Sequence, residues 1–365
     1  MSGIRVVIAD DSQVARDVLR AILSQDDAIE IVGEATNGRE AVELAKRLAP
    51  QLVTMDLNMP VMDGLSAIEE IMYTKGVPIL VISDRSDAQT AYRALEVGAL
   101  EVMPKPSLDT ADAEYLLERV RLLAGVAVIT RLRRRTSVPA PPTAASTPPA
   151  LPTHSLQPLS LPQAVPRDFQ RIVAIACSTG GPQALVHLLR MLPPSFPAPI
   201  VIAQHISHGF INGMAQWLAS LCAMPVSVGQ EGEHLCPGHI YLSPSESNLC
   251  VTPRHRFQLH PSPERALYRP SCDVLLQSVA DVYSADAIGV ILTGMGRDGV
   301  NGMRAIYQAG GTTLAQDEAS SVIYGMNQEA VNAGVIQHVL PLNDLPERLL
   351  RDVYVSAYSR PEPLT

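Results

Sequence analysis

Several carboxylates and one lysine each follow an apolar segment with the composition of a short strand. Asp10 and Asp11 follow the first such segment, Asp56 follows a later one, and Ser83 and Lys105 follow two more. Carboxylates packed together repel one another unless a cation lies among them, and their hard oxygen atoms suit Mg²⁺. With a metal bound, Asp56 is expected to attack a phosphoryl group, whose oxygens Ser83 and Lys105 would contact.

Each of these residues, taken alone, has an ordinary structural interpretation. Asp10, Asp11 and Asp56 could each be a helix cap or a loop residue, because short polar side chains favour both positions. The complete set favours a shared pocket instead, since every member stands at a predicted strand end and Lys105 is followed directly by Pro106. The carboxyl ends of parallel strands meet at one edge of a sheet.

A second set of residues could perform acyl transfer. Ser178 lies in residues 176–182 (ACSTGGP), between an apolar segment and a helix that Pro182 is expected to begin. A serine nucleophile needs a base and an orienting carboxylate. His205 and Asp298 each follow another apolar segment, so the sequence predicts that the three side chains can meet at one sheet edge.

Other chemistries for the turn at residues 176–182 are disfavoured. Its two glycines and its free helix amides would suit a phosphate as well as an oxyanion. A P-loop needs a Lys-Ser/Thr pair, but no lysine occurs after residue 124, and the G-x-G-x-x-G of dinucleotide-binding domains is absent from the turn. The order Ser, His, Asp and the missing G-x-S-x-G also disfavour the α/β-hydrolases.

The residues of the second set also have structural alternatives. Ser178 could cap the following helix, His205 could be a structural residue at a strand end, and Asp298 could cap a helix at Gly299. Cys177 is a rival nucleophile, although as the last residue of a strand it is expected to fill packing space. The combination favours catalysis by Ser178.

The segments that position these residues alternate between strand and helix patterns. In the first part, strands are predicted at Ile4–Ala9, Leu52–Met55, Ile79–Ile82 and Glu101–Met103, with helices after Ser12 and at Arg39–Leu48, Gly64–Met72 and Asp87–Val97. In the second, strands are predicted at Arg171–Ala176, Pro199–Ala203 and Ala287–Leu292, helices at Pro182–Met191, Phe210–Leu221, Cys272–Tyr283 and Gly299–Ala309, and an antiparallel excursion at Ala223–Pro263. The alternation predicts an α/β protein with two doubly wound parallel sheets.

A proline-rich stretch divides the 365-residue chain. Residues 136–166 contain no Asp, Glu, Lys or Arg, and nine of the 28 residues from Pro139 to Pro166 are proline. This composition offers too little apolar surface to offset the entropy of ordering, so an extended tether is expected. We therefore predict one domain at residues 1–124, a linker at 125–168 and a second domain at 169–358.

Composition and charge exclude several classes of protein. With 47% hydrophobic and 18% charged residues, the chain is typical of soluble globular proteins, and its apolar runs are far shorter than the roughly 20 residues that span a bilayer. The N-terminal residues lack the charged start, long apolar stretch and cleavage site of a secretion signal, so secretion by that route is not expected. Five cysteines without a C-x-x-C pair indicate reduced thiols, so a cytoplasmic location is expected. The net charge of −9 lies entirely in residues 1–124, and the short arginine cluster at Arg131–Arg135 does not predict nucleic-acid binding.

The first domain resembles the receiver domain of bacterial response regulators. The matching segments are Ala9-Asp10-Asp11-Ser12, Met55-Asp56-Leu57-Asn58-Met59-Pro60, Asp63-Gly64 and Lys105-Pro106. The resemblance implies that a histidine kinase phosphorylates Asp56, with Mg²⁺ held by Asp10, Asp11, Asp56 and the carbonyl of Asn58. It also implies that Ser83 and Lys105 respond to the phosphoryl group. Val102 stands where many receivers have an aromatic residue.

The second domain resembles the catalytic domain of bacterial chemotaxis protein-glutamate methylesterases, through the segments already described and residues 309–321 and 324–326. The resemblance implies hydrolysis of γ-glutamyl methyl esters on chemoreceptors and deamidation of receptor glutamines, without a metal at the esterase site. It makes Ser178 the nucleophile, His205 the general base and then acid, and Asp298 the orienting residue. The amides of Met295 and Thr179 would bind the oxyanion.

The two resemblances together imply an esterase under phosphorylation control. The unphosphorylated receiver would pack over the active site and the histidine kinase of the chemotaxis array would release it. A rival hypothesis is a response regulator whose hydrolase-like half has lost activity and only docks to a partner.

Overall fold

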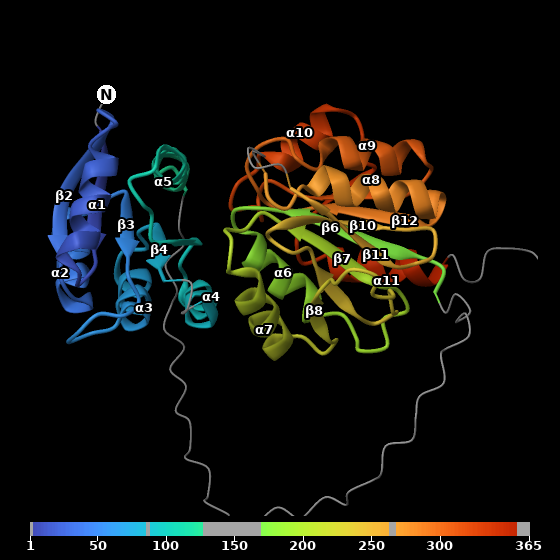
Figure 1. The fold of residues 1–365 in the computed structure, drawn as a ribbon, viewed down its shortest axis with the longest axis horizontal. Helices are drawn as coiled ribbons and strands as arrows, with labels where there is room; N and C mark the ends of the chain where they lie inside the picture. The colour runs from blue at the N-terminus through green and yellow to red at the C-terminus, as the bar shows by residue number, and fades with distance from the viewer. Residues whose placement is uncertain (1–2, 85–87, 127–168, 263–267, 356–365) are drawn as a thin grey trace, which may run out of the picture.

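The computed structural model describes residues 3–84, 88–126, 169–262 and 268–355, and its two halves each contain a parallel sheet (Figure 1). The first is five-stranded, with the order β2-β1-β3-β4-β5. Its strands are β1 (Ile4–Ala9), β2 (Ile29–Ala35), β3 (Leu52–Met55), β4 (Ile79–Ser83) and β5 (Glu101–Pro104). Its helices are α1 (Gln13–Leu23), α2 (Gly38–Leu48), α3 (Gly64–Thr74), α4 (Ala88–Val97) and α5 (Thr110–Leu123).

Polar residues begin the first three helices of this half. The side chain of Ser12 accepts a hydrogen bond from the Ala15 amide at the start of α1, and Asn37 and Asp63 do the same for α2 and α3. Such caps satisfy backbone amides that have no partner within the helix. The chain therefore turns from strand to helix shortly after β1 and β2 end and after a longer loop that follows β3, at the sheet edge that carries the aspartates.

The second half contains a seven-stranded sheet with the order β14-β13-β12-β6-β7-β9-β8, and a separate antiparallel pair, β10 and β11. Its strands are β6 (Ile172–Cys177), β7 (Ile200–Gln204), β8 (Val226–Val228), β9 (Ile240–Leu242), β10 (Ser247–Val251), β11 (Phe257–Pro261), β12 (Ala287–Ile291), β13 (Thr312–Gln316) and β14 (His338–Leu340). Its helices are α6 (Gly181–Leu189), α7 (Ile211–Leu221), α8 (Cys272–Tyr283), α9 (Val300–Gln308), α10 (Met326–Asn332) and α11 (Leu345–Val355), with a 3₁₀ turn at Ser284–Asp286.

Strand β6 shows why the second sheet is doubly wound. All six of its residues are buried. Val173 and Ile175 belong to the apolar cluster that contains α6, whereas Ala174 and Ala176 belong to the cluster that contains α8. A strand covered by helices on both faces has to be apolar throughout, as residues 172–177 are.

Both candidate sites lie where the strand order reverses. Strand β1 lies between β2 and β3, and β6 lies between β12 and β7, so the chain leaves each central strand toward one side and returns later on the other. In doubly wound sheets, ligands bind outside the carboxyl ends of the strands at such a reversal of strand order. Asp10 and Ser178 each follow one of the two central strands.

The expected antiparallel excursion over Ala223–Pro263 is wrong in part. Strands β8 and β9 are parallel to each other, and β9 is parallel to β7, so both extend the main sheet. Only β10 and β11 form an antiparallel pair. Residues 229–239 return the chain across the sheet without a helix, and this crossover has no periodic pattern that could reveal it.

The other predicted strands and helices occur within a few residues of their predicted bounds. Among the described residues, six strands and α-helices had no prediction: β2, α5, β13, α10, β14 and α11. The predicted linker at residues 125–168 falls outside the described residues except for its first two positions.

Candidate functional site

The aspartate pocket of the first half contains the residues that its sequence pattern predicts. The ammonium of Lys105 lies 2.9 Å from Oδ2 of Asp10 and 3.2 Å from Oδ2 of Asp56. Burial and the adjacent Asp10 carboxylate raise the pKa of Asp56, and Lys105 offsets part of this effect. A carboxylate held against another carboxylate in this way favours a further cation beside it.

The pocket fits a divalent metal ion. Carboxylate oxygens of Asp10, Asp11 and Asp56 lie within 4.8 Å of one another, and Asp11 is exposed to solvent. The hydroxyl of Ser83 is buried and has no hydrogen-bond partner among the described residues, so a polar group can still bind there. An oxygen-rich site with an open side suits Mg²⁺, which keeps several of its waters or takes a phosphate oxygen.

Close backbone packing fixes the loop that carries Asp56. A Cβ atom on Gly64 would lie 2.1 Å from the Asp56 carbonyl oxygen, so no side chain fits at the start of α3. The Gly64 amide donates to the carbonyl of Leu57 at 2.9 Å. The Asp63-Gly64 pair therefore acts through backbone contact with the loop after β3, which also carries Asn58.

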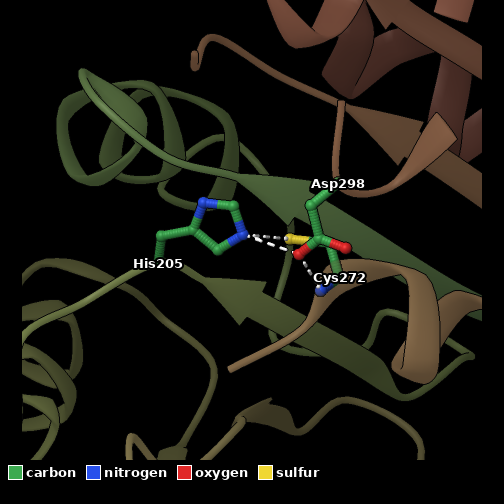
Figure 2. Close-up of side chains that lie close together, drawn as sticks. All are labelled: His205, Cys272 and Asp298. Atoms are coloured by element: carbon green, nitrogen blue, oxygen red, sulfur yellow. Dashed lines mark hydrogen bonds and ion pairs between the residues drawn. The ribbon is translucent and has the colours of Figure 1, made fainter. Parts of the chain in front are cut away.

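The second half brings together two of the three predicted catalytic side chains. His205 follows β7 and Asp298 lies in the loop after β12, and Nε2 of His205 is 2.7 Å from Oδ2 of Asp298 (Figure 2). The ring of His205 stacks on Tyr268, with centroids 4.9 Å apart. Because Nε2 contacts the carboxylate, Nδ1 is the nitrogen that remains to accept a proton.

Ser178 follows β6, the strand next to β7, and its backbone is firmly held. Its amide donates to the carbonyl of Thr293 at 3.0 Å, and its own carbonyl accepts from the side chain of Gln204 at 2.9 Å. In the described part of the chain its hydroxyl makes no hydrogen bond to His205. Gly180, with φ of 77°, takes the cap position of α6, so Ser178 is not the cap of that helix.

The carboxylate of Asp298 is fixed by the start of helix α8. It accepts hydrogen bonds from the hydroxyl of Ser271 at 3.0 Å and from the amides of Cys272 at 2.6 Å and Asp273 at 3.0 Å. Burial raises the pKa of Asp298, but its hydrogen bonds, first that from His205, outweigh burial and lower it. Asp298 therefore caps α8, not the helix at Gly299, and stays ionised beside His205.

Asp273 accepts hydrogen bonds from the backbone amides at the start of helix α9, as Asp298 does at the start of α8. Its Oδ1 accepts from the amides of Gly299 at 2.9 Å and Gly302 at 2.8 Å, and its Oδ2 accepts from the side chain of Asn301 at 3.0 Å. Each helix start is thus capped by an aspartate from the other segment. Since Gly299 directly follows Asp298, Asp273 positions the carboxylate that faces His205.

Replacing Asp273 with alanine is expected to lower kcat for ester hydrolysis roughly 10- to 100-fold with little change in KM, because a displaced carboxylate no longer orients the base. Asp273→Asn keeps an oxygen for Gly299 and should restore most of the activity. Asn301→Ala, which removes only the third contact, is the matched control. If Asp273→Ala loses only thermal stability and keeps its kcat, Asp273 has no positioning function.

Two backbone amides near Ser178 are free to bind an anion. Within the described residues, the amides of Thr179 and Met295 donate to no carbonyl or side chain of the protein. Gly294 makes this arrangement possible, because a Cβ atom on it would lie 2.7 Å from the Cβ of Ser178. The loops after β6 and β12 can therefore approach each other closely beside the serine.

Cys177 is the last residue of β6 and is completely buried. Burial raises the pKa of its thiol strongly, so Cys177 stays protonated and is a poor nucleophile. All five cysteines lie in described segments and are free thiols. Sequence reasoning gave Cys272 no role, although its sulfur lies 3.5 Å from Nε2 of His205.

The receiver-like half contacts the turn beside Ser178. The hydroxyl of Thr179 donates to Glu101 at 2.9 Å and accepts from Arg119 at 3.1 Å, and these two charged residues lie 3.7 Å apart. The side chain of Gln183 on α6 donates to the carbonyl of Ala99 at 2.8 Å. The residue next to the predicted nucleophile is therefore held by β5 and α5 of the other half.

A second set of contacts joins α4 and α7. Tyr92 stacks on Trp217 with ring centroids 5.5 Å apart, and the indole nitrogen of Trp217 donates to Glu96. Both aromatic rings are buried. These contacts between distant segments have no local sequence signal.

None of the described helices is long and apolar enough to cross a membrane.

Comparisons with known proteins match both halves. A family model for CheB methylesterase matches residues 173–349, and one for the response regulator receiver domain matches residues 6–121. Protein-glutamate methylesterase/protein-glutamine glutaminase 3 of Paramagnetospirillum magneticum is 51% identical to this chain, and the match covers 98% of each protein. Protein-glutamate methylesterase/protein-glutamine glutaminase 4 of Myxococcus xanthus is 44% identical, and the match covers 95% of this chain and 96% of the relative. The crystal structure of the Thermotoga maritima CheB methylesterase catalytic domain is 36% identical, covering 50% of this chain and 97% of its own with a TM-score of 0.48. The chain therefore belongs to the family of protein-glutamate methylesterases/protein-glutamine glutaminases, with a receiver domain and a CheB methylesterase domain.

Proposed function

We propose that this chain hydrolyses γ-glutamyl methyl esters of chemoreceptors, with Ser178 as nucleophile, and that its receiver domain controls this activity. The observation that carries the proposal is the 2.7 Å bond between His205 and Asp298, at the sheet edge where Ser178 follows the adjacent strand. The names of the relatives support the substrate class. Release of methanol from methyl-labelled receptor membranes tests it.

The reaction begins with attack of the Ser178 hydroxyl oxygen on the ester carbonyl, while Nδ1 of His205 takes the hydroxyl proton. Asp298 keeps the proton on Nε2 and stabilises the imidazolium that forms. The amides of Thr179 and Met295 bind the oxyanion that develops on the carbonyl oxygen. His205 then returns the proton to the leaving methoxide, so methanol departs and an acyl-enzyme on Ser178 remains.

Water completes the cycle when His205 takes its proton and the resulting hydroxide attacks the acyl-enzyme. The products are a free glutamate side chain and regenerated Ser178. Glutamine side chains differ from the ester only in the leaving group, so the same steps with ammonia as the leaving group give deamidation. We therefore expect receptor glutamines to be a second class of substrate.

The receiver pocket would receive the phosphoryl group of a histidine kinase in the chemotaxis array on Asp56. Asp10, Asp11, Asp56 and the Asn58 carbonyl would hold Mg²⁺, which neutralises charge on the transferred group. Lys105 already contacts Asp56, and the free hydroxyl of Ser83 offers a hydrogen bond to a phosphoryl oxygen. Both would therefore change partners on phosphorylation.

Control of the esterase would come from the contacts at Thr179. Through Glu101 and Arg119, which contact the Thr179 side chain, the receiver lies against the turn that carries Ser178. A chemoreceptor segment has to displace these contacts before its ester reaches Ser178. The closed arrangement is therefore the inhibited state, and phosphorylation opens it.

Deleting residues 1–135 is expected to raise the basal rate of methanol release, because the cover over Thr179 is removed. If the closed state is favoured by about 1.4 kcal/mol, the increase is about tenfold. The measurement is the initial rate of methanol release by the truncated and unphosphorylated full-length proteins at equal concentration. A truncated protein no faster than the whole chain would show that the receiver does not inhibit, and that phosphorylation acts by recruitment to receptors.

A small phosphodonor with Mg²⁺ is expected to bring the full-length protein close to the rate of the truncated protein. Asp56→Ala should remove this activation without lowering the basal rate, because Asp56 lies outside the esterase site. Phosphoryl incorporation and methanol release are measured on the same samples. Activation of Asp56→Ala by the phosphodonor would contradict the assignment of Asp56.

The organisation of the chain is proposed with the boundaries predicted from composition: a receiver at residues 1–124, a linker at 125–168 and a catalytic domain at 169–358. The family matches at residues 6–121 and 173–349 support these boundaries. A cytoplasmic location is also proposed, on the five free thiols and on the substrates and phosphodonor that the function requires.

A further inference from the structure

Cys272 places a sulfur atom against the His205–Asp298 pair. It is the first residue of α8 and its side chain is fully buried. Its sulfur lies 3.5 Å from Nε2 of His205 and 3.4 Å from the carbonyl oxygen of Ala203. Figure 2 shows Nε2 of His205 directed toward both the sulfur and the carboxylate. The mechanism of ester hydrolysis makes no use of this thiol.

The three side chains form a compact donor set. One nitrogen of His205, the sulfur of Cys272 and one carboxylate oxygen of Asp298 all lie within 4.8 Å of one another. An imidazole, a thiolate and a carboxylate together are typical ligands of Zn²⁺, whereas Mg²⁺ and Ca²⁺ prefer oxygen atoms alone. This donor set thus differs in kind from the aspartate pocket of the receiver.

The two distances from Nε2 of His205 can be compared with those of a tetrahedral zinc ion. Zinc bonds of roughly 2.0 Å to nitrogen and 2.3 Å to sulfur place those two ligand atoms about 3.5 Å apart. The separation of Nε2 and the sulfur is 3.5 Å, so these atoms need no rearrangement. Nitrogen and oxygen ligands of zinc lie about 3.4 Å apart, so Oδ2 of Asp298 would have to withdraw by about 0.7 Å from its present 2.7 Å.

We propose that His205, Cys272 and Asp298 form an inhibitory binding site for a zinc ion within the esterase centre, with Nε2, the thiolate sulfur and Oδ2 as ligands. Three protein ligands leave a fourth position for water, as in other open zinc sites. The charges of the thiolate and the carboxylate balance the ion, which compensates for taking it into a buried site. The side chain of His205 is 13% exposed and offers solvent one route to the ligands.

Binding of the ion changes the proton positions in a defined way. The thiol of Cys272 loses its proton to solvent, so one proton is released for each zinc ion bound. The proton on Nε2 of His205 moves to Nδ1, because the metal takes the Nε2 lone pair. Nδ1 then donates and can no longer accept the proton of Ser178, so the esterase is inactive while zinc is bound. Inhibition rests on the proposed roles of Ser178 and His205, whereas metal binding does not.

Metal binding is tested with Co²⁺, a spectroscopic substitute for zinc, on the full-length protein in excess Mg²⁺ to occupy the receiver pocket. A thiolate-to-cobalt charge-transfer band is expected in the parent protein and should disappear when Zn²⁺ is added. Cys272→Ala and Cys272→Ser should lack the band, and the zinc dissociation constant from competition should rise at least about tenfold in each. Cys236→Ala, which removes an exposed thiol, is the matched control and should keep both the charge-transfer band and the zinc dissociation constant of the parent protein.

Esterase activity is measured in the same titration, with each variant compared with its own metal-free rate. Zinc should inhibit the parent and Cys236→Ala proteins, a chelator should restore their activity, and the Cys272 variants should resist inhibition. An unchanged zinc dissociation constant in both Cys272 variants would overturn the site. If the band and its dependence on Cys272 are found but esterase activity is unaffected by zinc, the metal site stands and the proposed role of His205 fails.

Discussion

Replacing Ser178 with alanine is expected to lower methanol release by a factor of about 10⁴ or more, because alanine has no hydroxyl that could form the acyl-enzyme. Phosphorylation of Asp56 should be unchanged, which shows that the receiver is intact, and an unchanged thermal unfolding curve should show that the catalytic half is folded. The measurement is the initial rate of methanol release from methyl-labelled receptor membranes, with the phosphodonor present for both proteins.

The matched control for this prediction is Cys177→Ala. The thiol of Cys177 is buried within β6, and burial raises its pKa, so removing it should leave activity nearly unchanged. Activity that survives in Ser178→Ala and is lost in Cys177→Ala would assign the nucleophile to the cysteine. Both substitutions change one atom of neighbouring residues, so the comparison isolates the identity of the nucleophile.

His205→Gln and Asp298→Asn are each expected to lower kcat by roughly 10³- to 10⁴-fold. The double variant should lose little more than His205→Gln alone, because Asp298 acts only through the imidazole that it orients. Initial rates for the four proteins form a double-mutant cycle. Thermal unfolding is measured in parallel, since Asp298 also accepts hydrogen bonds from Ser271, Cys272 and Asp273.

The outcome that would contradict a shared triad is a double variant whose loss equals the product of the two single losses. Independent losses of that kind would mean that Asp298 contributes only through the start of α8. Asp273→Ala gives an independent check, because the contacts of Asp273 in the described segments include neither His205 nor Ser178, and any loss of kcat would come through the position of Asp298.

The sequence predicted the fold best where local patterns and topology agree. Short apolar segments followed by polar caps placed β1 and α1, and the rule that strand ends share an edge predicted that Asp10, Asp56 and Lys105 would meet. The ion pairs at 2.9 and 3.2 Å confirm that these side chains lie together. In the second half, the same rule brought His205 and Asp298 within hydrogen-bond distance.

Contacts between distant segments could not be predicted in this way. Asp298 and Asp273 cap each other's helices, but their sequence signal is only an acidic residue near a helix start. The contact of Thr179 with Glu101 joins residues from different halves. The parallel β9 was also missed, because a three-residue strand carries too little periodicity to indicate its direction.

The function of the chain is tested most directly by methanol release from methyl-labelled chemoreceptor membranes, with and without Mg²⁺ and a small phosphodonor. We expect slow release by the unphosphorylated protein and faster release after phosphorylation, with each methanol matched by one carboxylate gained on the receptor. A phosphorylated protein that binds the membranes but releases no methanol would contradict the proposed esterase activity, and the chain would then be a regulator that only docks to its partner.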